Sequence, residues 1–216
     1  MQTSNVTSMD TLNYMPMHTS KIASTHIPRN ENALQQIFQK AIPTTVNPEG
    51  KIIKICFYEP KPDDVWLNRL VASMGKHYVS HVEIMFQDGM AASIFADDVV
   101  FWKERTYSNP QYKILGVEVS TKSYWQMYNH AQDTARRQVG FDNVKMFCGP
   151  FMGYRGYSDR TYCSEFVTQT LQVGGVKWAM KMNASRSTPS GLLDFMLNNC
   201  YICFDTTAFK LGQAFG

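Results

Sequence analysis

Asp88 and Gly89 are the feature that most constrains the fold of this chain, because the pair predicts a tight two-residue turn. The segment before the turn, 78–86, and the segment after it, 91–95, both have residue patterns typical of short strands. Strands joined by such a turn lie side by side and antiparallel. The sequence therefore predicts a sheet that contains an antiparallel hairpin.

Other segments extend this sheet and add helices to it. Alternating apolar residues predict strands over 51–58, 99–103 and 112–119, with a final strand over 201–204. The predicted helices are one capped by Asp63 or Asp64 that runs to about 75, one capped by Ser120 or Thr121 that runs to 139, one from Cys163 to about 174, and one over 192–197. Antiparallel strands with added helices predict the α+β class.

Two of these segments carry specific expectations about burial and structure. The segment 146–157 is rich in Gly and aromatic residues and is expected to be a loop. The helix that ends near 75 has an apolar stripe, which we expect to be buried. That stripe consists of Trp66, Leu67, Leu70, Val71 and Met74.

The first 50 residues differ in composition from the rest of the chain. Residues 1 to about 31 are rich in Ser, Thr, Asn and Met and lack an apolar period. Within 32–42, apolar residues share one helical face. We therefore expect a flexible N-terminal arm over 1–50, with a short helix in it, and one folded domain over 51–216.

Composition excludes several classes of protein. A hydrophobic fraction of 44% and an aromatic fraction of 13% are typical of a folded domain rather than a disordered chain. The formal charge of +3 and the scattered basic residues do not form a nucleic-acid-binding surface. The sequence has no signal-peptide pattern and no apolar run of about 18 residues, so we expect no transmembrane segment.

The five cysteines lack the regular spacing of a disulfide framework, which favours a reducing, cytoplasmic setting. Cys200 and Cys203 form a lone C-x-x-C with no second pair of ligands. We therefore expect no metal site and no cofactor. Cys56 and Cys148, like this pair, are expected to be structural.

Cys163 is the candidate nucleophile, because it lies where a turn becomes a helix. With Thr161 as the N-cap, the thiol would lie in the first helical turn. Unpaired N–H groups there stabilise a thiolate and can receive the oxyanion of a tetrahedral intermediate. The alternative is a buried cysteine that packs as a small hydrophobe.

His81 is the candidate partner for this thiol. On the strand over 78–86, His81 and Glu83 project from one face, and apolar residues project from the other. An imidazole there can accept a thiol proton, and a carboxylate can fix its tautomer. The alternative is a polar sheet face with no role in chemistry.

These residues resemble a known family. The strand with His81 and Glu83, the hairpin at Asp88, the Tyr-Cys-Ser-Glu-Phe-Val segment around Cys163 and the Pro-containing turn before 192 are similar to the circularly permuted, papain-like branch of the NlpC/P60 superfamily. In that branch the histidine precedes the cysteine. The resemblance covers about 51–197 and is closest to members from large DNA viruses. It implies a small sheet with the cysteine helix packed against it.

The third catalytic residue departs from the family pattern. Family members commonly place a polar residue on the strand that follows the histidine strand. A two-residue turn would instead set Ala96 opposite His81. Ser93, Asp97 or Glu83 could take this role, and Glu83 is favoured because it shares the face of His81.

The resemblance implies a thiol-dependent peptidase, amidase or acyltransferase that acts through a thioester. The catalytic residues would be Cys163, His81 and Glu83, and the substrate a peptide, an amide or an acyl lipid. One alternative is a phospholipid acyltransferase or thioesterase, with peripheral membrane contact through the aromatic residues of 147–157. A second is a weak or inactive viral structural or host-interaction protein. A viral protein would be in the host cytoplasm or the virion, and its oligomeric state stays open.

Overall fold

The computed structural model describes residues 50–152, 159–199 and 203–205. The predicted arm over 1–50 and its helix over 32–42 lie almost wholly outside these residues. The elements are β1 (Lys51–Tyr58), α2 (Trp66–Ser73), β2 (His81–Met85), β3 (Met90–Ser93), β4 (Phe101–Glu104), β5 (Tyr112–Val119), α3 (Thr121–Arg136), β6 (Gly140–Phe141), α4 (Asn143–Met152), β7 (Arg160–Thr161), α5 (Cys163–Val173), α6 (Pro189–Asn199) and β8 (Cys203–Asp205). Two short 3-10 helices, Ala179–Lys181 and Ala184–Arg186, join α5 to α6.

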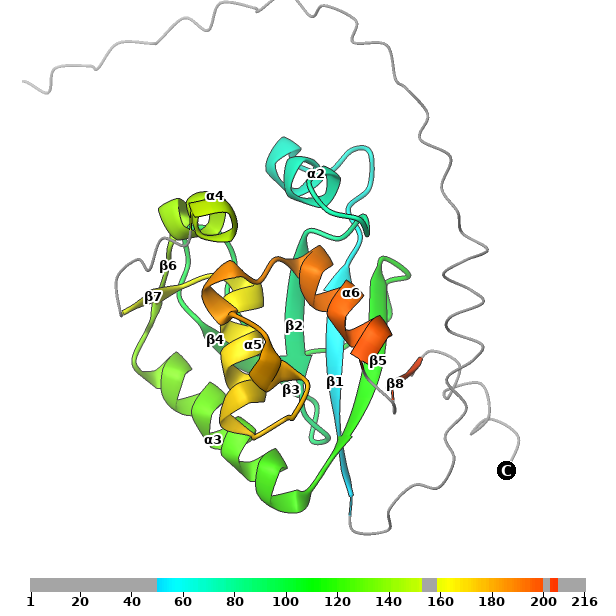
Figure 1. Cartoon of the computed structure of the whole chain (residues 1–216), viewed down its shortest axis with the longest axis vertical. Coiled ribbons are helices and arrows are strands. Elements are labelled where there is room, and N and C mark those ends of the chain that lie inside the picture. Colours follow the sequence, from blue (N-terminus) through cyan, green and yellow to red (C-terminus); the bar gives the residue numbers. More distant parts are fainter. Residues whose placement is uncertain (1–49, 153–158, 200–202, 206–216) are drawn as a thin grey trace, which may run out of the picture. The chain divides into compact units, whose positions relative to one another are not determined.

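A six-stranded antiparallel sheet forms the centre of the fold. Its strand order is β4-β3-β2-β1-β5-β8, and each neighbouring pair is antiparallel. The short strands β6 and β7 form a separate parallel pair. In Figure 1, α3, α5 and α6 cover one face of the sheet. The predicted α+β class with an antiparallel sheet is confirmed.

The hairpin between β2 and β3 has a three-residue loop rather than the predicted two-residue turn. Ile84 pairs with Ala92, and the Phe86 N–H donates to the Met90 carbonyl. Gly89, with φ of 87°, supplies the left-handed residue that such a loop requires. The pairing is therefore shifted by one residue from the expected register.

This shift changes the residue beside His81. Continued past the end of β3, the observed register sets Phe95 rather than Ala96 opposite the histidine. The rings of His81 and Phe95 stack with centroids 4.6 Å apart. An aromatic ring therefore packs against the imidazole at the position where the sequence predicted an alanine.

The strands β1 and β5 have the predicted bounds. The N-cap of α2 is Val65 rather than Asp63 or Asp64, and α6 is longer at both ends than the predicted 192–197.

Two further differences concern α3 and α4. The helix α3 has the predicted N-cap, because Ser120 accepts a hydrogen bond from the Ser123 N–H. It ends at Arg136 rather than 139, and Gln138 then adopts a φ of 54°. The second difference is that α4 occupies most of the segment predicted to be a loop. The Lys145 N–H donates to the Asp142 carboxylate, which caps the start of this helix.

The predicted buried stripe of α2 is mostly exposed. Ala72 is the one buried residue of this helix, and Trp66, Leu70 and Met74 are 65%, 40% and 51% exposed. Helical spacing shows only that apolar residues share a face, not that another element covers it. In Figure 1, α2 stands at one end of the sheet, apart from the helices that cover its face.

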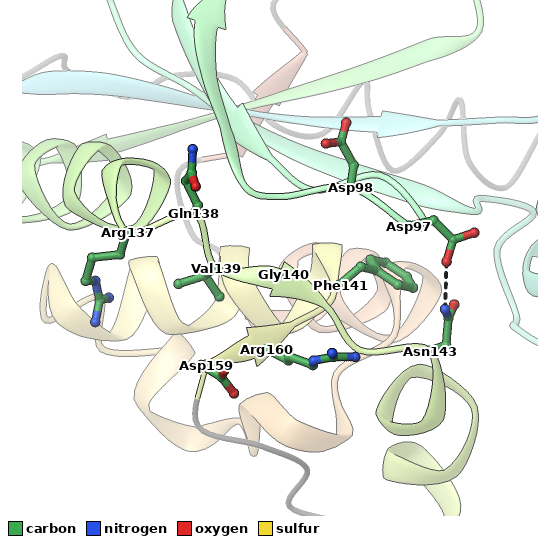
Figure 2. A pocket seen from close by; sticks show the side chains of 10 residues that line it. All are labelled: Asp97, Asp98, Arg137, Gln138, Val139, Gly140, Phe141, Asn143, Asp159 and Arg160. Carbon is green, nitrogen blue, oxygen red and sulfur yellow. Dashed lines mark hydrogen bonds between the residues drawn. The ribbon is translucent and has the colours of Figure 1, made fainter. Parts of the chain in front are cut away.

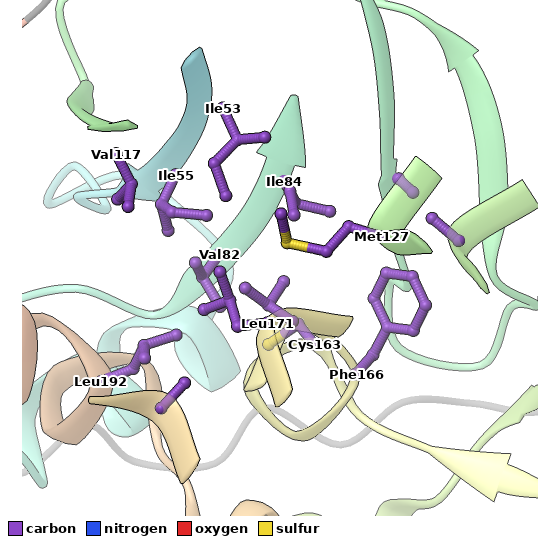
Figure 3. Close-up of a cluster of buried hydrophobic side chains, with 14 of the residues drawn as sticks. Ile53, Ile55, Val82, Ile84, Val117, Met127, Cys163, Phe166, Leu171 and Leu192 are labelled. Atoms are coloured by element: carbon purple, nitrogen blue, oxygen red, sulfur yellow. The ribbon is translucent and has the colours of Figure 1, made fainter. Parts of the chain in front are cut away.

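The main core lies between the sheet and the covering helices. Strand residues such as Ile53, Val82 and Ile84 pack against Phe166 and Leu171 of α5 (Figure 3). All five of these residues are almost completely buried. The start of α5 is thereby held against the middle of the sheet, as the candidate site requires.

Candidate active site

Cys163 is the first residue of α5. Tyr162, rather than the predicted Thr161, is the N-cap, and it makes no side-chain capping bond. The backbone N–H of Cys163 is thus among the four at the helix start that have no partner within the helix. The thiol is 6% exposed, and it lines a cleft of about 500 Å³.

His81 lines the same cleft, and its interaction with Cys163 is the largest influence that raises the pKa of the imidazole. It is the first residue of β2, where the strand end brings its ring beside the start of α5. The packing of Val82 against Cys163 and α5 in Figure 3 fixes the two elements relative to each other. The starts of the cysteine helix and of the histidine strand, far apart in the sequence, therefore lie close together.

Glu83 lies behind His81. Its carboxylate is fully buried, and its Oε1 is 3.6 Å from His81 Nε2. Arg105 forms an ion pair with Oε1 at 2.9 Å, the Tyr112 hydroxyl donates to the same oxygen at 3.0 Å, and the Tyr107 hydroxyl donates to Oε2. Three donors thus hold the carboxylate in one position against the imidazole.

The interactions among these groups favour charged forms. Burial alone would lower the pKa of His81, but the interactions with Cys163 and then with Glu83 outweigh it and raise the pKa to about 9. Burial alone would raise the pKa of Glu83, but His81, Tyr107 and Arg105 lower it. An ionised carboxylate and an imidazolium are therefore the expected forms near neutral pH.

The other predicted candidates do not reach the imidazole. Ser93 donates its hydroxyl to the Val82 carbonyl at 2.6 Å and is fully buried. Asp97 is exposed and accepts a hydrogen bond from Asn143 at 2.8 Å. Of the three residues proposed for the third position, Glu83 alone contacts His81.

Sequence reasoning missed Arg105, Tyr107 and Tyr112. Arg105 and Tyr107 lie in the connection between β4 and β5, where no periodic pattern exists. Tyr112 begins β5, and the strand pattern predicts no polar role for it. One signal could have pointed to them. Glu83 is predicted on an inner strand, and a buried carboxylate there requires hydrogen-bond donors from neighbouring segments.

A second buried ion pair supports the helix of Cys163 from its other side. Lys145 Nζ of α4 lies 2.6 Å from Glu165 Oε1 of α5, and both side chains are buried. The Thr161 hydroxyl also donates to Glu165. This pair joins α4 to the first turn of α5, and so it positions the helix start without facing the thiol.

The other cysteines with described side chains have structural surroundings. Cys56 is fully buried on β1, opposite Glu83, and burial followed by the charge of Glu83 raises its pKa. It therefore stays a neutral thiol. Cys148 is a partly buried residue of α4. Cys200 and the side chain of Cys203 lie outside the described residues.

A larger cavity, of about 780 Å³, lies beside the cleft and shares Phe141 with it. Figure 2 shows its charged lining, with acidic and basic side chains drawn from several connections. The charged residues are Asp97, Asp98, Arg137, Asp159 and Arg160. Because no thiol, histidine or other activated nucleophile lines it, the smaller cleft is the candidate active site.

Within the described ranges, no cluster of three or more His, Cys, Asp or Glu side chains could hold a metal ion. A search of the same ranges finds no helix long and apolar enough to cross a membrane.

No family model matches this chain, and no curated protein or solved structure matches it. The candidate site is therefore defined by the structure alone, through the positions of Cys163, His81 and Glu83.

Proposed function

We propose that this chain is a thiol-dependent hydrolase or acyltransferase with the permuted NlpC/P60-like, papain-like arrangement. Cys163 is the nucleophile, His81 is the proton carrier, and Glu83 orients the imidazole. The observation that supports this most strongly is that Cys163 and His81 line one cleft, with the buried carboxylate of Glu83 3.6 Å from the imidazole. In that arrangement the nucleophile has a base nearby, and the base has a carboxylate that orients it.

The first half of the reaction forms a thioester. In the first step the thiol proton passes to His81, and the sulfur becomes the nucleophile. The sulfur attacks the substrate carbonyl, a carbon–sulfur bond forms, and the carbonyl electron pair moves onto oxygen. Collapse of this intermediate breaks the bond to the leaving group, which takes the proton from His81.

The second half regenerates the thiol. Neutral His81 accepts a proton from water, or from an acceptor hydroxyl or amine, as that group attacks the thioester. The new tetrahedral intermediate then collapses, the carbon–sulfur bond breaks, and the product leaves. The proton that His81 accepted from the attacking group is the one that can return to the sulfur. Ionised Glu83 stabilises the imidazolium at both stages, which keeps the ring in one orientation.

The walls of the cleft suit an acyl group with both polar and apolar parts. Leu67, Val71, Ile94 and Met146 give the cleft an apolar side, and Asn68 lines it as a polar group. A peptide or amide substrate can use both kinds of surface. We therefore favour peptides and amides as the substrate class.

The exposed face of α2 favours a second candidate, an acyl-lipid substrate. Leu67 and Val71 of this helix line the cleft, while Trp66, Leu70 and Met74 continue the apolar surface outside it. Such a surface could rest on a lipid layer and lead an acyl chain to the thiol. This helix replaces the segment 147–157 as the candidate membrane contact.

Covalent trapping tests the proposal and separates the two substrate classes. The protein would be incubated either with a short-chain nitrophenyl ester or with phosphatidylcholine vesicles, and its intact mass measured. We expect one acyl group on Cys163 with the ester, and loss of that group in hydroxylamine. Acylation by vesicles as well would favour the lipid class.

Two variants serve as controls in this experiment. Cys163→Ala must remain unmodified, and Cys148→Ala must acylate like the parent protein, because Cys148 lies outside the cleft. An acyl group on another residue, or none on the parent protein with either donor, would contradict the proposed function.

A further inference from the structure

Buried polar atoms without a hydrogen-bond partner concentrate at the cleft. Five such side-chain atoms occur among the described residues, and three of them belong to residues that line the cleft: Ser80 Oγ, His81 Nε2 and Arg105 Nε. A buried polar atom left without a partner is destabilising, and each one calls for an explanation. Their shared location makes the cleft the place to look for that explanation.

Two of the three atoms have an explanation in the site already described. His81 Nε2 lies 3.6 Å from the carboxylate of Glu83, and the opposite charges of an imidazolium and a carboxylate attract at this distance. Arg105 already donates through Nη2 to Glu83 and to Tyr112. The Ser80 hydroxyl has neither role. It is the unexplained group, in a residue that is 7% exposed.

The backbone fixes Ser80 at the wall of the cleft that holds the thiol. Its N–H donates to the Tyr58 carbonyl at 2.9 Å, and the next residue is His81. Ser80 directly precedes β2, and its side chain is among those that line the cleft. Ser80, His81 and Cys163 thus share one cleft.

We propose that the Ser80 hydroxyl is a catalytic hydrogen-bond donor to the oxyanion, an assignment that rests on the proposed function. When the thiolate attacks a carbonyl carbon, the electron pair that moves onto oxygen needs donors placed in advance. The N–H of Cys163, at the first position of α5, supplies one donor. Ser80 Oγ–H supplies a second, and both bonds are released when the carbonyl re-forms.

Ser80→Ala tests this role, because two reactions of the same thiol differ in their need for an oxyanion. Acylation by the nitrophenyl ester passes through a tetrahedral intermediate, whereas alkylation by iodoacetamide displaces iodide directly. We expect acylation to slow by about 10²–10³-fold, mainly in the rate at saturating ester. Alkylation should stay within about twofold of the parent rate.

Ser190→Ala is the matched control. Ser190 is also a buried serine, but its hydroxyl accepts a hydrogen bond from the His77 N–H at 2.8 Å. Loss of this bond should lower stability and leave acylation unchanged. Ser80→Ala removes a hydroxyl without a partner, so its midpoint of thermal unfolding should not fall.

Two outcomes would overturn the assignment. Parent-like acylation by Ser80→Ala would show that the hydroxyl takes no part in the reaction. A parallel loss of acylation and alkylation would show that Ser80 acts on the thiol or on folding instead. If the parent protein does not acylate at Cys163 at all, the proposed function fails first, and the role of Ser80 fails with it.

Discussion

Replacing His81 with Gln is expected to slow acylation of Cys163 by the nitrophenyl ester about 10²–10⁴-fold at neutral pH. His81 interacts with the thiol, and its raised pKa keeps the imidazole charged under these conditions. Glutamine can fill part of the same space, but it cannot accept the thiol proton. The thiol then lacks the imidazole that takes its proton, and a leaving amine lacks the imidazolium that protonates it. The rate of adduct formation, followed by intact mass, measures the effect.

His130→Gln is the control for this substitution. His130 is a partly buried residue in the middle of α3, and its ring stacks loosely on Phe166 with centroids 6.4 Å apart. It does not line the cleft, so its variant should acylate at the parent rate. If His81→Gln and His130→Gln both react within twofold of the parent protein, His81 is not the proton carrier.

Replacing Glu83 with Ala is expected to lower the free energy of unfolding by about 3–5 kcal/mol. The substitution leaves the cation of Arg105 without its buried partner, and it removes the acceptor of the Tyr107 and Tyr112 hydroxyls. Urea denaturation measures the loss. Glu83→Gln keeps one acceptor oxygen and a similar volume, so it should be destabilised less while still losing the charge that stabilises the imidazolium.

The two variants separate the structural role of Glu83 from its catalytic role. We expect Glu83→Gln to fold and yet to acylate Cys163 at least an order of magnitude more slowly. Glu104→Ala, at the exposed end of β4, should change stability by no more than about 0.5 kcal/mol and leave acylation intact. A folded Glu83→Gln with the parent acylation rate would remove Glu83 from the mechanism.

Local sequence patterns predicted the parts of the site that depend on local geometry. The two-residue period of a strand places His81 and Glu83 together, and a helix start can be located from the residues around Cys163. Both relations hold over a few residues. The sequence could therefore identify the cysteine, the histidine and the favoured carboxylate before any contact was known.

Contacts between distant segments could not be predicted in this way. Arg105 and Tyr112 meet Glu83 only because the sheet brings β2 close to β5 through β1. The helix α4 forms in a segment of poor helix propensity, where the ion pair of Lys145 with Glu165 fixes it to α5. One extra loop residue changed the neighbour of His81 from an alanine to a phenylalanine. Each of these depends on tertiary packing.

The acid–base behaviour of His81 tests the central claim most directly. Its titration would be followed by NMR in a protein with isotope-labelled imidazoles, with His81→Gln used for assignment. We expect a pKa of about 9, against the ordinary value of 6.5. Because the folded value is the higher one, the stabilisation from protonated His81 is complete below pH 6.5 and is lost as the pH rises through about 9.

Cys163→Ala should move this titration toward lower pH, since the interaction with the thiol is the largest influence that raises the pKa of His81. Such a result would establish that the imidazole and the thiol act as one unit beside Glu83. A titration near pH 6.5 in the parent protein, unchanged by Cys163→Ala, would contradict the account.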